Sequence, residues 1–547
     1  MYIGKLGFRM CLSTRVLSVF FYIAIPLTSV AANFYVSANG NDGNSGTSTS
    51  SAWKTINKVN SRLYNAGDRI LFEGGVTFSG KIYITKGGAS ANPLTITSYG
   101  NGKAVINGGG AEAFFAYNTG GIDLKNIIFK GNGIGVNGIK GGGVGFYNDL
   151  GGNIKLSRVY IDNVEIYGFG AINTGAVDGR GYPRRSGGEG ISIGGWNGAS
   201  GFQDVQITNS NVHDNEGNGI TVYGLANYSN QNIKIINVTA YNNTGRTSSP
   251  DSSQYSGSGI VIYSARQALI ERCTAYNNGT RGNGTAGIMI LETEGAVIQH
   301  NTAYNNRTAG DADGDGFDLD GGTKNSVLQY NFAYGNDGAG ILIAEYPGSS
   351  VHSNNIVRYN ISAADGGKRN YGSFHLWNGS GAGMVRDLHV YNNTFFSDLA
   401  VGGTKLLIQF AGNTVQNVNF RNNIFAGASA GVYMMYIPAM SPGLVFHNNN
   451  YWAGGTTPIF YVGNKTYNGL SEWQLRAGQD TVSGISENPR FANPRDGANG
   501  FKILTGSPMI DRGIAIQGTS KRDYFGSPTP FGKGYDIGAH EYSTGTP

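Results

Sequence analysis

Short stretches in the middle of the chain alternate hydrophobic and polar residues, and these stretches recur. Six of them share the pattern x-G-I-x-I, in which every second residue is apolar, so each predicts a β-strand with one buried face. Their glycines follow one another in steps of 24 to 40 residues. The segments are EGISI, NGITV, SGIVI, AGIMI, DGFDL and AGILI, with glycines Gly190, Gly219, Gly259, Gly287, Gly316 and Gly340.

A second recurring segment, TAYNN at Thr239, Thr274 and Thr302 and FAYGN at Phe332, accompanies the first. Repeats of this length made only of strands predict an all-β fold, a right-handed parallel β-helix in which each repeat is one coil and coils stack about 4.8 Å apart. A β-propeller would need four strands per blade and longer units.

Two columns of stacked side chains follow from this alignment, and we interpret both as structural. Asn tolerates the left-handed turn geometry and can satisfy backbone groups there. The columns are an amide ladder of Asn243, Asn278, Asn306 and Asn336 and an aromatic stack of Tyr241, Tyr276, Tyr304 and Tyr334.

The two ends of the solenoid carry different patterns. Trp53, Ile56, Val59 and Leu63 have helical spacing, which predicts an N-terminal amphipathic capping helix over the first coil. Coils begin near Arg69, and the repeat fades after about residue 451, where SEWQLRAGQD and DIGAHEY indicate an irregular C-terminal cap. The predicted organisation is a signal peptide over 1–32, an N-terminal strand and capping helix over 33–68, the β-helix over 69–450 and the C-terminal cap over 451–547.

The first 32 residues have the pattern of a secretory signal. Lys5, Arg9 and Arg15 precede the apolar run VLSVFFYIAIPL, and small residues up to Ala32 offer a cleavage site. We therefore expect a secreted, periplasmic or cell-surface protein, a monomer with no membrane span once the signal is removed. A retained anchor is the alternative, although the run is short for a span.

Composition excludes several other classes of protein. The chain has 547 residues, 39% hydrophobic and 14% charged, which is globular composition, and its 88 glycines favour an architecture rich in turns. The formal net charge of the whole chain is +5, and without the three positive charges of the signal the net charge is about +2. A protein that binds nucleic acid usually carries a clearly basic surface, so this net charge argues against a nucleic-acid partner. Cys273 is the one cysteine after the signal, so no intramolecular disulfide is expected.

One stretch, GDADGDGFDLDGG from Gly310 to Gly322, concentrates negative charge. If Phe317 and Leu319 point into the core, Asp318 and Asp320 point outward on one face. Alignment of the repeats places Glu292 and Glu345 on the neighbouring coils, above and below Gly321, and His375 in the column of Asp318 two coils later. Such crowding is relieved by a bound cation or by raised pKa values, and both are useful in catalysis.

Further side chains are expected along the same face. Tyr223, Tyr263 and Trp377 share the column of Asp320, and exposed rings beside a groove are suited to stack on sugars. Arg266 and Lys324 lie nearby and can contact an anionic chain. Plain surface packing is the alternative interpretation of these residues.

The N-terminal segments FYVSANGNDGNSGTSTSSAWKTINKV, GDRILFEGG and PLTITSYGNGKAVING resemble those of secreted pectin-lyase-like β-helix proteins, including calcium-dependent pectate lyases of polysaccharide lyase family nine. DGFDL resembles the D-D-G-W-D-L stretch that supplies calcium ligands in that family, which implies Asp315 and Asp318 as ligands, with Gly314 at the family's first Asp. The strand G-F-K-L that carries the family's catalytic lysine is absent, and Asp318 stands where that lysine would be.

The order D-x-D-x-D-G at Asp311, Asp313 and Asp315 also resembles the opening of a calcium loop, although no Glu completes it. We therefore expect Ca²⁺ at Asp311, Asp313, Asp315 and Asp318, either catalytic or as a structural clip.

From the sequence we predict a secreted polysaccharide-cleaving enzyme, and of three candidate functions the first is the one we favour. The first is calcium-assisted β-elimination of an acidic polysaccharide, with His375 as base. The second is a glycoside hydrolase that pairs carboxylates among Asp318, Asp320, Glu292 and Glu345, since outward residues i and i+2 stand about 6.6–6.8 Å apart. The third is a calcium-stabilised glycan-binding or adhesin protein, but acid concentrated on one coil favours a catalytic site.

Overall fold

The structure is a computed structural model that describes residues 31–135, 138–177, 183–226, 228–246, 256–368, 371–412 and 414–543. The predicted signal peptide, apart from its last two residues, lies outside the described residues. Among the described residues, no helix is both long enough and apolar enough to cross a membrane.

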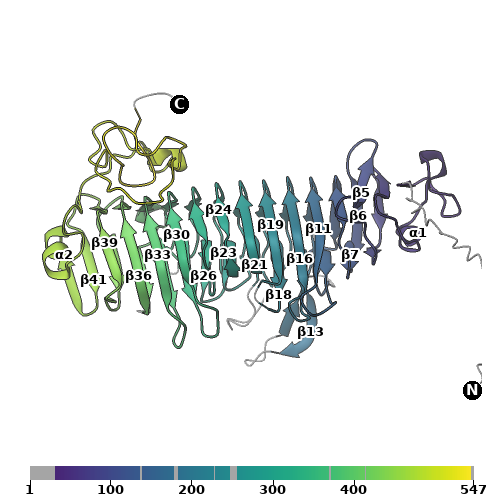
Figure 1. Cartoon of the computed structure of the whole chain (residues 1–547), viewed down its shortest axis with the longest axis horizontal. Coiled ribbons are helices and arrows are strands. Elements are labelled where there is room, and N and C mark those ends of the chain that lie inside the picture. The colour runs from purple at the N-terminus through teal and green to yellow at the C-terminus, as the bar shows by residue number, and fades with distance from the viewer. Residues whose placement is uncertain are drawn as a thin grey trace, which may run out of the picture. The chain divides into compact units, whose positions relative to one another are not determined.

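From Ala31 onward the chain is a solenoid of parallel β-strands, which confirms the predicted right-handed parallel β-helix (Figure 1). Each coil contributes one strand to each of three series, and each strand pairs in parallel with the equivalent strand one coil away. The second series begins at β2 (Arg69–Glu73), as predicted, and the N-terminal strand β1 (Asn33–Val36) pairs with it.

The first series carries the x-G-I-x-I segments. Its members are β4 (Ile82–Ile84), β7 (Phe114–Tyr117), β10 (Gly142–Tyr147), β15 (Glu189–Gly195), β18 (Ile220–Gly224), the start of β21 (Ile260–Glu271), β23 (Thr285–Glu294), β26 (Asp313–Leu319), β29 (Ile341–Glu345), β32 (Phe374–Asn378), β35 (Leu406–Ala411), β38 (Tyr433–Ile437) and β41 (Ile459–Val462).

The second series follows after one bend of each coil. Its members after β2 are β5 (Leu94–Tyr99), β8 (Ile122–Lys125), β11 (Lys155–Asp162), β16 (Gly201–Thr208), β19 (Asn230–Ile236), the end of β21, β24 (Val297–Gln299), β27 (Val327–Gln329), β30 (Ser353–Arg358), β33 (Val385–Tyr391), β36 (Val415–Arg421) and β39 (Leu444–His447).

The third series carries the TAYNN segments. Its members are β3 (Thr77–Ser79), β6 (Ala104–Gly109), β9 (Ile127–Gly131), β12 (Glu165–Tyr167), β17 (Asn211–His213), β20 (Thr239–Tyr241), β22 (Thr274–Tyr276), β25 (Thr302–Tyr304), β28 (Phe332–Tyr334), β31 (Ile361–Ala363), β34 (Thr394–Ser397), β37 (Ile424–Gly427) and β40 (Asn450–Ala453).

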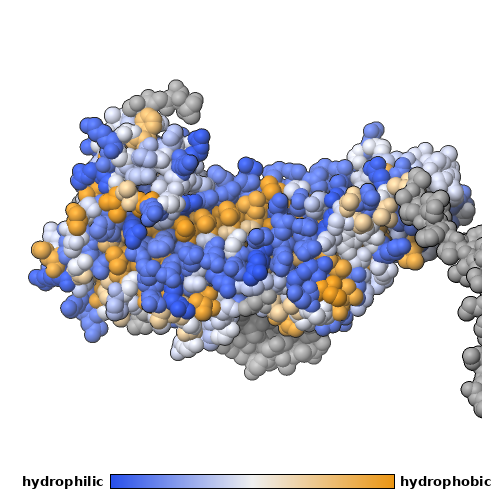
Figure 2. Space-filling view, viewed as in Figure 1, coloured by the Kyte–Doolittle hydropathy of each residue, from blue (hydrophilic) through white to orange (hydrophobic). Residues whose placement is uncertain are grey.

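The core is formed by the alternating inward residues of all three series. In β26, for example, Phe317 and Leu319 are buried in the main cluster, where Ile288, Ile290 and Ile341 of the adjacent coils also lie. Apolar residues also remain on outer faces, and Figure 2 shows them gathered in a band across the coils. Because parallel strands in a solenoid repeat one register, one apolar position per coil becomes a continuous stripe.

Both predicted columns are confirmed. The Asn side chains donate from each amide to the next amide oxygen at 3.0 Å, from Asn243 through Asn278 and Asn306 to Asn336. The ladder begins earlier, at Asn215, and ends at Asp365, to which Asn336 Nδ2 donates at 2.8 Å. The Tyr rings stack with centroids 4.7–4.9 Å apart.

A second amide ladder, which the sequence analysis did not identify, runs at the turn before the third series. Each Asn again donates to the next, and the last donates to Asp480 at 3.2 Å. Its members are Asn301, Asn331, Asn360, Asn393, Asn423, Asn449 and Asp480.

The N-terminal helix is shorter than the predicted one. It is α1 (Ile56–Asn60), capped by the Thr55 side chain, and it buries Ile56 and Val59 over the first coils. The prediction that Leu63 belongs to the apolar face is wrong, because the helix ends at Asn60 and Leu63 is 68% exposed.

The C-terminal end has two parts. Parallel pairing continues to β41, after which β42 (Lys465–Asn468) turns back antiparallel and α2 (Leu470–Ala477) buries Trp473. The tail then returns to the outside of the solenoid, where Asn392 and Asn422 side chains donate to its backbone.

A separate antiparallel hairpin, β13 (Ile172–Val177) and β14 (Pro183–Ser186), projects from the coils. There are also three short 3-10 helices among the described residues. The first, η1 (Thr49–Ser51), lies in the N-terminal cap, η2 (Leu399–Val401) lies in a loop after β34, and η3 (Ala498–Phe501) lies in the tail.

Candidate active site

The pairing register places the acidic strand β26 as the sequence alignment predicted. Asp318 pairs with Met289 of β23 on one side and Leu342 of β29 on the other. The column continues backward through Val261 and forward to His375. Asp318 is thus the one acidic residue in a run of otherwise apolar outward positions from Val261 to Leu342.

Asp318 does not protrude into solvent as expected from its outward position. Its side chain is 1% exposed, and its register neighbours Met289 and Leu342 are also buried. Oδ1 is buried without a hydrogen-bond partner among the described residues. Burial, followed by the charges of Asp320, Asp313 and Asp315, raises the pKa of Asp318 well above its usual range. Burial therefore favours the protonated form of this carboxyl group.

Asp320 lies at the end of the same strand and is half-buried. Its backbone N–H donates to Ile290 O at 2.9 Å, and its Oδ1 accepts from Gly321 N–H at 2.7 Å. Burial raises the pKa of Asp320 to about 6, and the negative charge of Glu292 contributes to this shift. A pKa of about 6 favours the ionised form of Asp320 near neutral pH, whereas burial favours the protonated form of Asp318.

Glu292 and Glu345 flank Gly321, as predicted. Glu292 N–H donates to Gly321 O at 2.8 Å, and Glu292 Oε1 accepts from Ser350 N–H at 2.7 Å. Glu345 is fully buried, and its two oxygens accept from Ser349 Oγ at 2.7 Å and Gly322 N–H at 3.3 Å. We call Asp318, Asp320, Glu292 and Glu345 the acid cluster.

The members of the acid cluster act on one another electrostatically. Burial, followed by the charges of Glu292 and Asp320, raises the pKa of Glu345 to about 7. Tyr346, whose pKa is raised by burial and then by Asp320 and Glu292, also faces this cluster. Sequence reasoning missed Tyr346, because its position in a loop after β29 belongs to no repeated column.

Two glycines make room for this arrangement. A Cβ on Gly321 would come within 2.7 Å of Tyr346 Cδ1, and Gly322 has a φ of +72° with Glu292 Oε1 2.8 Å from the position of a Cβ. A side chain at either position would displace the ring or the carboxylate. The G-G pair that closes GDADGDGFDLDGG is therefore part of the site.

The expected calcium ligands do not converge. Asp311 is exposed, whereas Asp315 is fully buried and its Oδ1 accepts from Ala339 N–H. No group of three or more His, Cys, Asp or Glu side chains within the described parts of the chain is arranged to hold a metal ion. Burial and the charge of Asp313 raise the pKa of Asp315 well above its usual range. Calcium binding at these aspartates stays a prediction.

His375 lies two coils from Asp318, in the predicted column, but it is not solvent-accessible. Its ring stacks on Tyr371 at 4.4 Å between centroids, and its Nδ1 is 2.9 Å from Gln409 Oε1. Burial lowers the pKa of His375 to about 4, so the ring is neutral at physiological pH. Trp377, on the same strand, pairs with Ala344 and is 39% exposed.

Tyr223 and Tyr263 are half-buried on the first series. The pKa of Tyr263 is raised by burial and then by the charge of Glu292, which places this ring beside the acid cluster. Arg266 and Lys324 are engaged with other groups: Arg266 pairs with Glu294 at 3.0 Å, and both cations lie over the Tyr228 ring, at 4.4 and 5.1 Å. These two cations neutralise Glu294 rather than the acid cluster.

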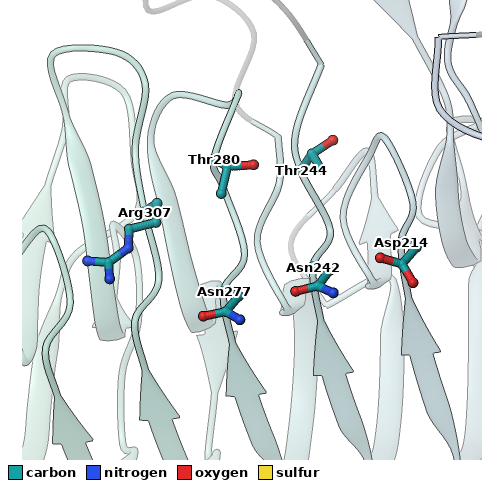
Figure 3. A pocket seen from close by; sticks show the side chains of 6 residues that line it. All are labelled: Asp214, Asn242, Thr244, Asn277, Thr280 and Arg307. Carbon is teal, nitrogen blue, oxygen red and sulfur yellow. The ribbon is translucent and has the colours of Figure 1, made fainter.

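A polar cavity of about 370 Å³ lies elsewhere, on the turns that follow the third series (Figure 3). It contains none of the residues predicted from the sequence for the site. Its lining residues are Asp214, Asn242, Thr244, Asn277, Thr280 and Arg307.

Comparison with known proteins agrees with the fold. A family model described as right handed beta helix region matches residues 184–415, a range that contains the whole acid cluster. The structure of GH136 lacto-N-biosidase from Eubacterium ramulus aligns with a TM-score of 0.54 at 16% identity, covering 79% of this chain and 68% of that chain. The resemblance to pectin-lyase-like right-handed β-helix proteins is confirmed at the level of the fold.

Two further matches are informative to different degrees. A lacto-N-biosidase from Bifidobacterium longum is 40% identical over 94 residues, which are 16% of this chain and 6% of that protein. The match thus spans a small part of the relative's length. The pectate lyase Pel9A aligns over 94% of this chain and 97% of its own at 16% identity, with a TM-score of 0.40.

Proposed function

We propose that this chain is a secreted enzyme that hydrolyses glycosidic bonds of an extracellular polysaccharide at the acid cluster. The observation that carries the proposal is the pair Asp318 and Asp320, the first in β26 and the second directly after it, buried and half-buried, with different pKa shifts. Two carboxyl groups held in different protonation states are what glycoside hydrolysis needs. Export is included because of the N-terminal signal pattern, and the lacto-N-biosidase matches support a carbohydrate substrate.

The two aspartates would take complementary roles. The protonated Asp318 donates its proton to the glycosidic oxygen as the bond to the anomeric carbon breaks. Asp320 accepts a proton from the water that attacks that carbon from the opposite side. Outward residues i and i+2 have Cα atoms about 6.6–6.8 Å apart, which suits the wider carboxyl separation of inverting enzymes, about 6.5–9.5 Å. Glu292 raises the pKa of Asp320, and Glu292 and Glu345 act as positioning residues.

Elimination is the second candidate, favoured by the neutral imidazole of His375 in the column of Asp318. A lyase would also need a cation to neutralise a uronate. The nearby cations Arg266 and Lys324 are instead engaged with Glu294 and Tyr228, and the aspartates do not converge as a metal site. We therefore derive no step through calcium.

One assay separates these functions. The mature protein is incubated with xylan, β-glucan, galactan, polygalacturonate and alginate, with and without EDTA, and new reducing ends and ultraviolet absorbance of unsaturated ends are both followed. Hydrolysis predicts reducing ends without unsaturation and no effect of EDTA. Unsaturated product that disappears with EDTA would establish calcium-assisted elimination. Neither product on any polymer would favour the non-catalytic glycan-binding protein.

The pH dependence of hydrolysis follows from Asp320. Its pKa is raised to about 6, so below pH 6 the carboxyl is protonated and cannot accept a proton from water. We expect kcat/KM to fall about tenfold per pH unit below pH 6. The Glu292→Gln variant removes the negative charge that raises the pKa of Asp320 and should move this limb to lower pH. As a control, Asp523→Asn removes a carboxyl in the C-terminal tail whose pKa is also raised to about 6, and it should leave the limb in place. An unchanged limb in Glu292→Gln would contradict the assignment.

A further inference from the structure

Aromatic side chains continue from the acid cluster toward the N-terminal coils of the first series. Tyr117 of β7 pairs with Tyr147 of β10, Tyr147 pairs with Gly194 of β15, and Gly194 pairs with Tyr223 of β18. Trp196 follows β15 directly, and its ring centroid is 5.1 Å from that of Tyr223. We call the whole set the aromatic track: Tyr83, Phe115, Tyr117, Tyr147, Trp196 and Tyr223.

Glycines on the neighbouring strands allow these rings to lie over the sheet. Phe115 pairs with Gly145, and a Cβ there would come within 2.7 Å of Phe115 Cδ2. Tyr223 pairs with Gly194, where a Cβ would come within 2.8 Å of Tyr223 Cδ2. A ring that occupies the space above a neighbouring glycine lies roughly parallel to the sheet surface instead of pointing away from it. Such a ring can present its face to a ligand.

The third-series tyrosines show the contrast. Tyr241, Tyr276 and Tyr304 stack parallel within 3° and with centroids 4.8–4.9 Å apart, so each ring covers the face of the next. In the aromatic track the ring centroids of Tyr83 and Phe115, and those of Tyr117 and Tyr147, are 6.2 Å apart, so these stacked rings overlap less than the third-series rings do. Tyr83 is 41% exposed and Trp196 is 51% exposed. The aromatic track therefore exposes ring surface to solvent at these two residues, whereas the third-series tyrosines cover one another's faces.

The charges beside the track are nearly balanced. Lys81 pairs with Glu112 at 3.3 Å, and Glu189, which acts on Tyr223, pairs with Arg246 at 2.7 Å. Asp149 accepts from Tyr117 Oη at 3.2 Å and adds a negative charge. No excess of cations among these residues would attract a polyanion, and the acid cluster beyond would repel one. An uncharged chain fits this surface.

From these observations we infer that the aromatic track binds a neutral polysaccharide chain that lies along the solenoid axis and leads into the acid cluster. The inference rests on the proposed function for the direction of the chain, and it adds the class of substrate. Six coil steps separate β7 from β26, roughly 29 Å at about 4.8 Å each. The bound stretch is therefore an extended chain of several sugars, and the enzyme cleaves within polymers.

Affinity gel electrophoresis tests the track without catalysis. Native gels are cast with xylan, β-glucan or galactomannan as neutral polymers and with polygalacturonate or alginate as acidic ones, and the Asp318→Asn variant is used so that nothing is cleaved. We expect retardation in at least one neutral polymer, and at least tenfold weaker binding after Trp196→Ala or Tyr147→Ala in the same background. Soluble fragments of that polymer should also quench the fluorescence of Trp196, a signal missing in Trp196→Ala.

The control is Phe531→Ala, which removes a ring that is 38% exposed on the C-terminal tail and should leave retardation unchanged. Retardation confined to acidic polymers, no retardation in any gel, or equal retardation of the Trp196→Ala variant would each overturn the inference. Because binding is measured without turnover, a track that binds while the wild-type protein hydrolyses nothing would preserve this inference and reject the proposed function alone.

Discussion

Replacing Asp318 by Asn is expected to lower kcat by about 10²- to 10⁴-fold, because the amide cannot protonate the leaving oxygen. The same change should leave the protein as stable as the wild type or more stable at pH 7. Asp318 Oδ1 is buried without a partner, and its raised pKa means that ionisation at higher pH opposes folding. A loss of activity together with equal or higher stability separates a catalytic role from a structural one.

The measurements are initial rates on the polymer identified by the product assay and thermal unfolding at pH 5 and pH 8. The sign follows from the raised pKa: its contribution to stability is present at low pH and is lost as pH rises, so the stabilising effect of Asp318→Asn should be larger at pH 8. Glu294→Gln is the matched control, since Glu294 lies on the adjacent coil but pairs with Arg266 and should change kcat less than threefold. Full activity of Asp318→Asn would reject this site.

Replacing Asn306 by Ala is expected to destabilise the protein by about 3–6 kcal/mol. The Asn306 amide donates to Asn336 Oδ1 at 3.0 Å and to Ala275 O at 3.1 Å, and its oxygen accepts from Asn278 Nδ2 at 3.0 Å. The substitution removes these three buried hydrogen bonds, at about 1–2 kcal/mol for each bond. Asn336 Oδ1 keeps the backbone N–H of residue 306 at 2.9 Å, and Asn278 Nδ2 keeps Ala240 O at 3.0 Å.

Urea unfolding followed by circular dichroism measures this effect. The control is Asn305→Gly, at the preceding residue, which keeps the left-handed backbone (φ 51°) and removes an amide outside the ladder. We expect it to cost less than about 1 kcal/mol. A loss below 1 kcal/mol for Asn306→Ala would show that the ladder contributes little to stability.

The repeat made much of the architecture predictable. Because one register runs through the whole first series, aligning the glycines placed Asp318 beside Met289 and Leu342, and Glu292 and Glu345 around Gly321. The same alignment gave the Asn and Tyr columns. These features depend on strand pairing, which a periodic sequence specifies directly.

What lies outside the repeat was not predictable. An outward position does not imply exposure, since Asp318 is 1% exposed and His375 is 2% exposed. The contact of Tyr346 with the cluster depends on one loop, and the spacing D-x-D-x-D does not reveal that Asp311 faces solvent while Asp315 binds Ala339 N–H. The early end of α1 likewise depends on how the chain meets the first coil, which local spacing does not encode.

Both amide ladders are directional, and each one stops at an aspartate. Each Asn Nδ2 donates a hydrogen bond to the side-chain oxygen of the next ladder residue. Asp365 and Asp480 have carboxylate oxygens and no side-chain N–H, so each accepts from the last Asn and donates to no further residue. A duplicated coil inserted before Asp365 or Asp480 would add one more Asn to the ladder and keep every hydrogen bond. In a coil inserted directly after either aspartate, the new Asn oxygen would face a carboxylate oxygen, and both atoms are acceptors. Each aspartate therefore marks the last coil of its ladder, whereas the parallel strands of the solenoid continue past Asp365 to β41.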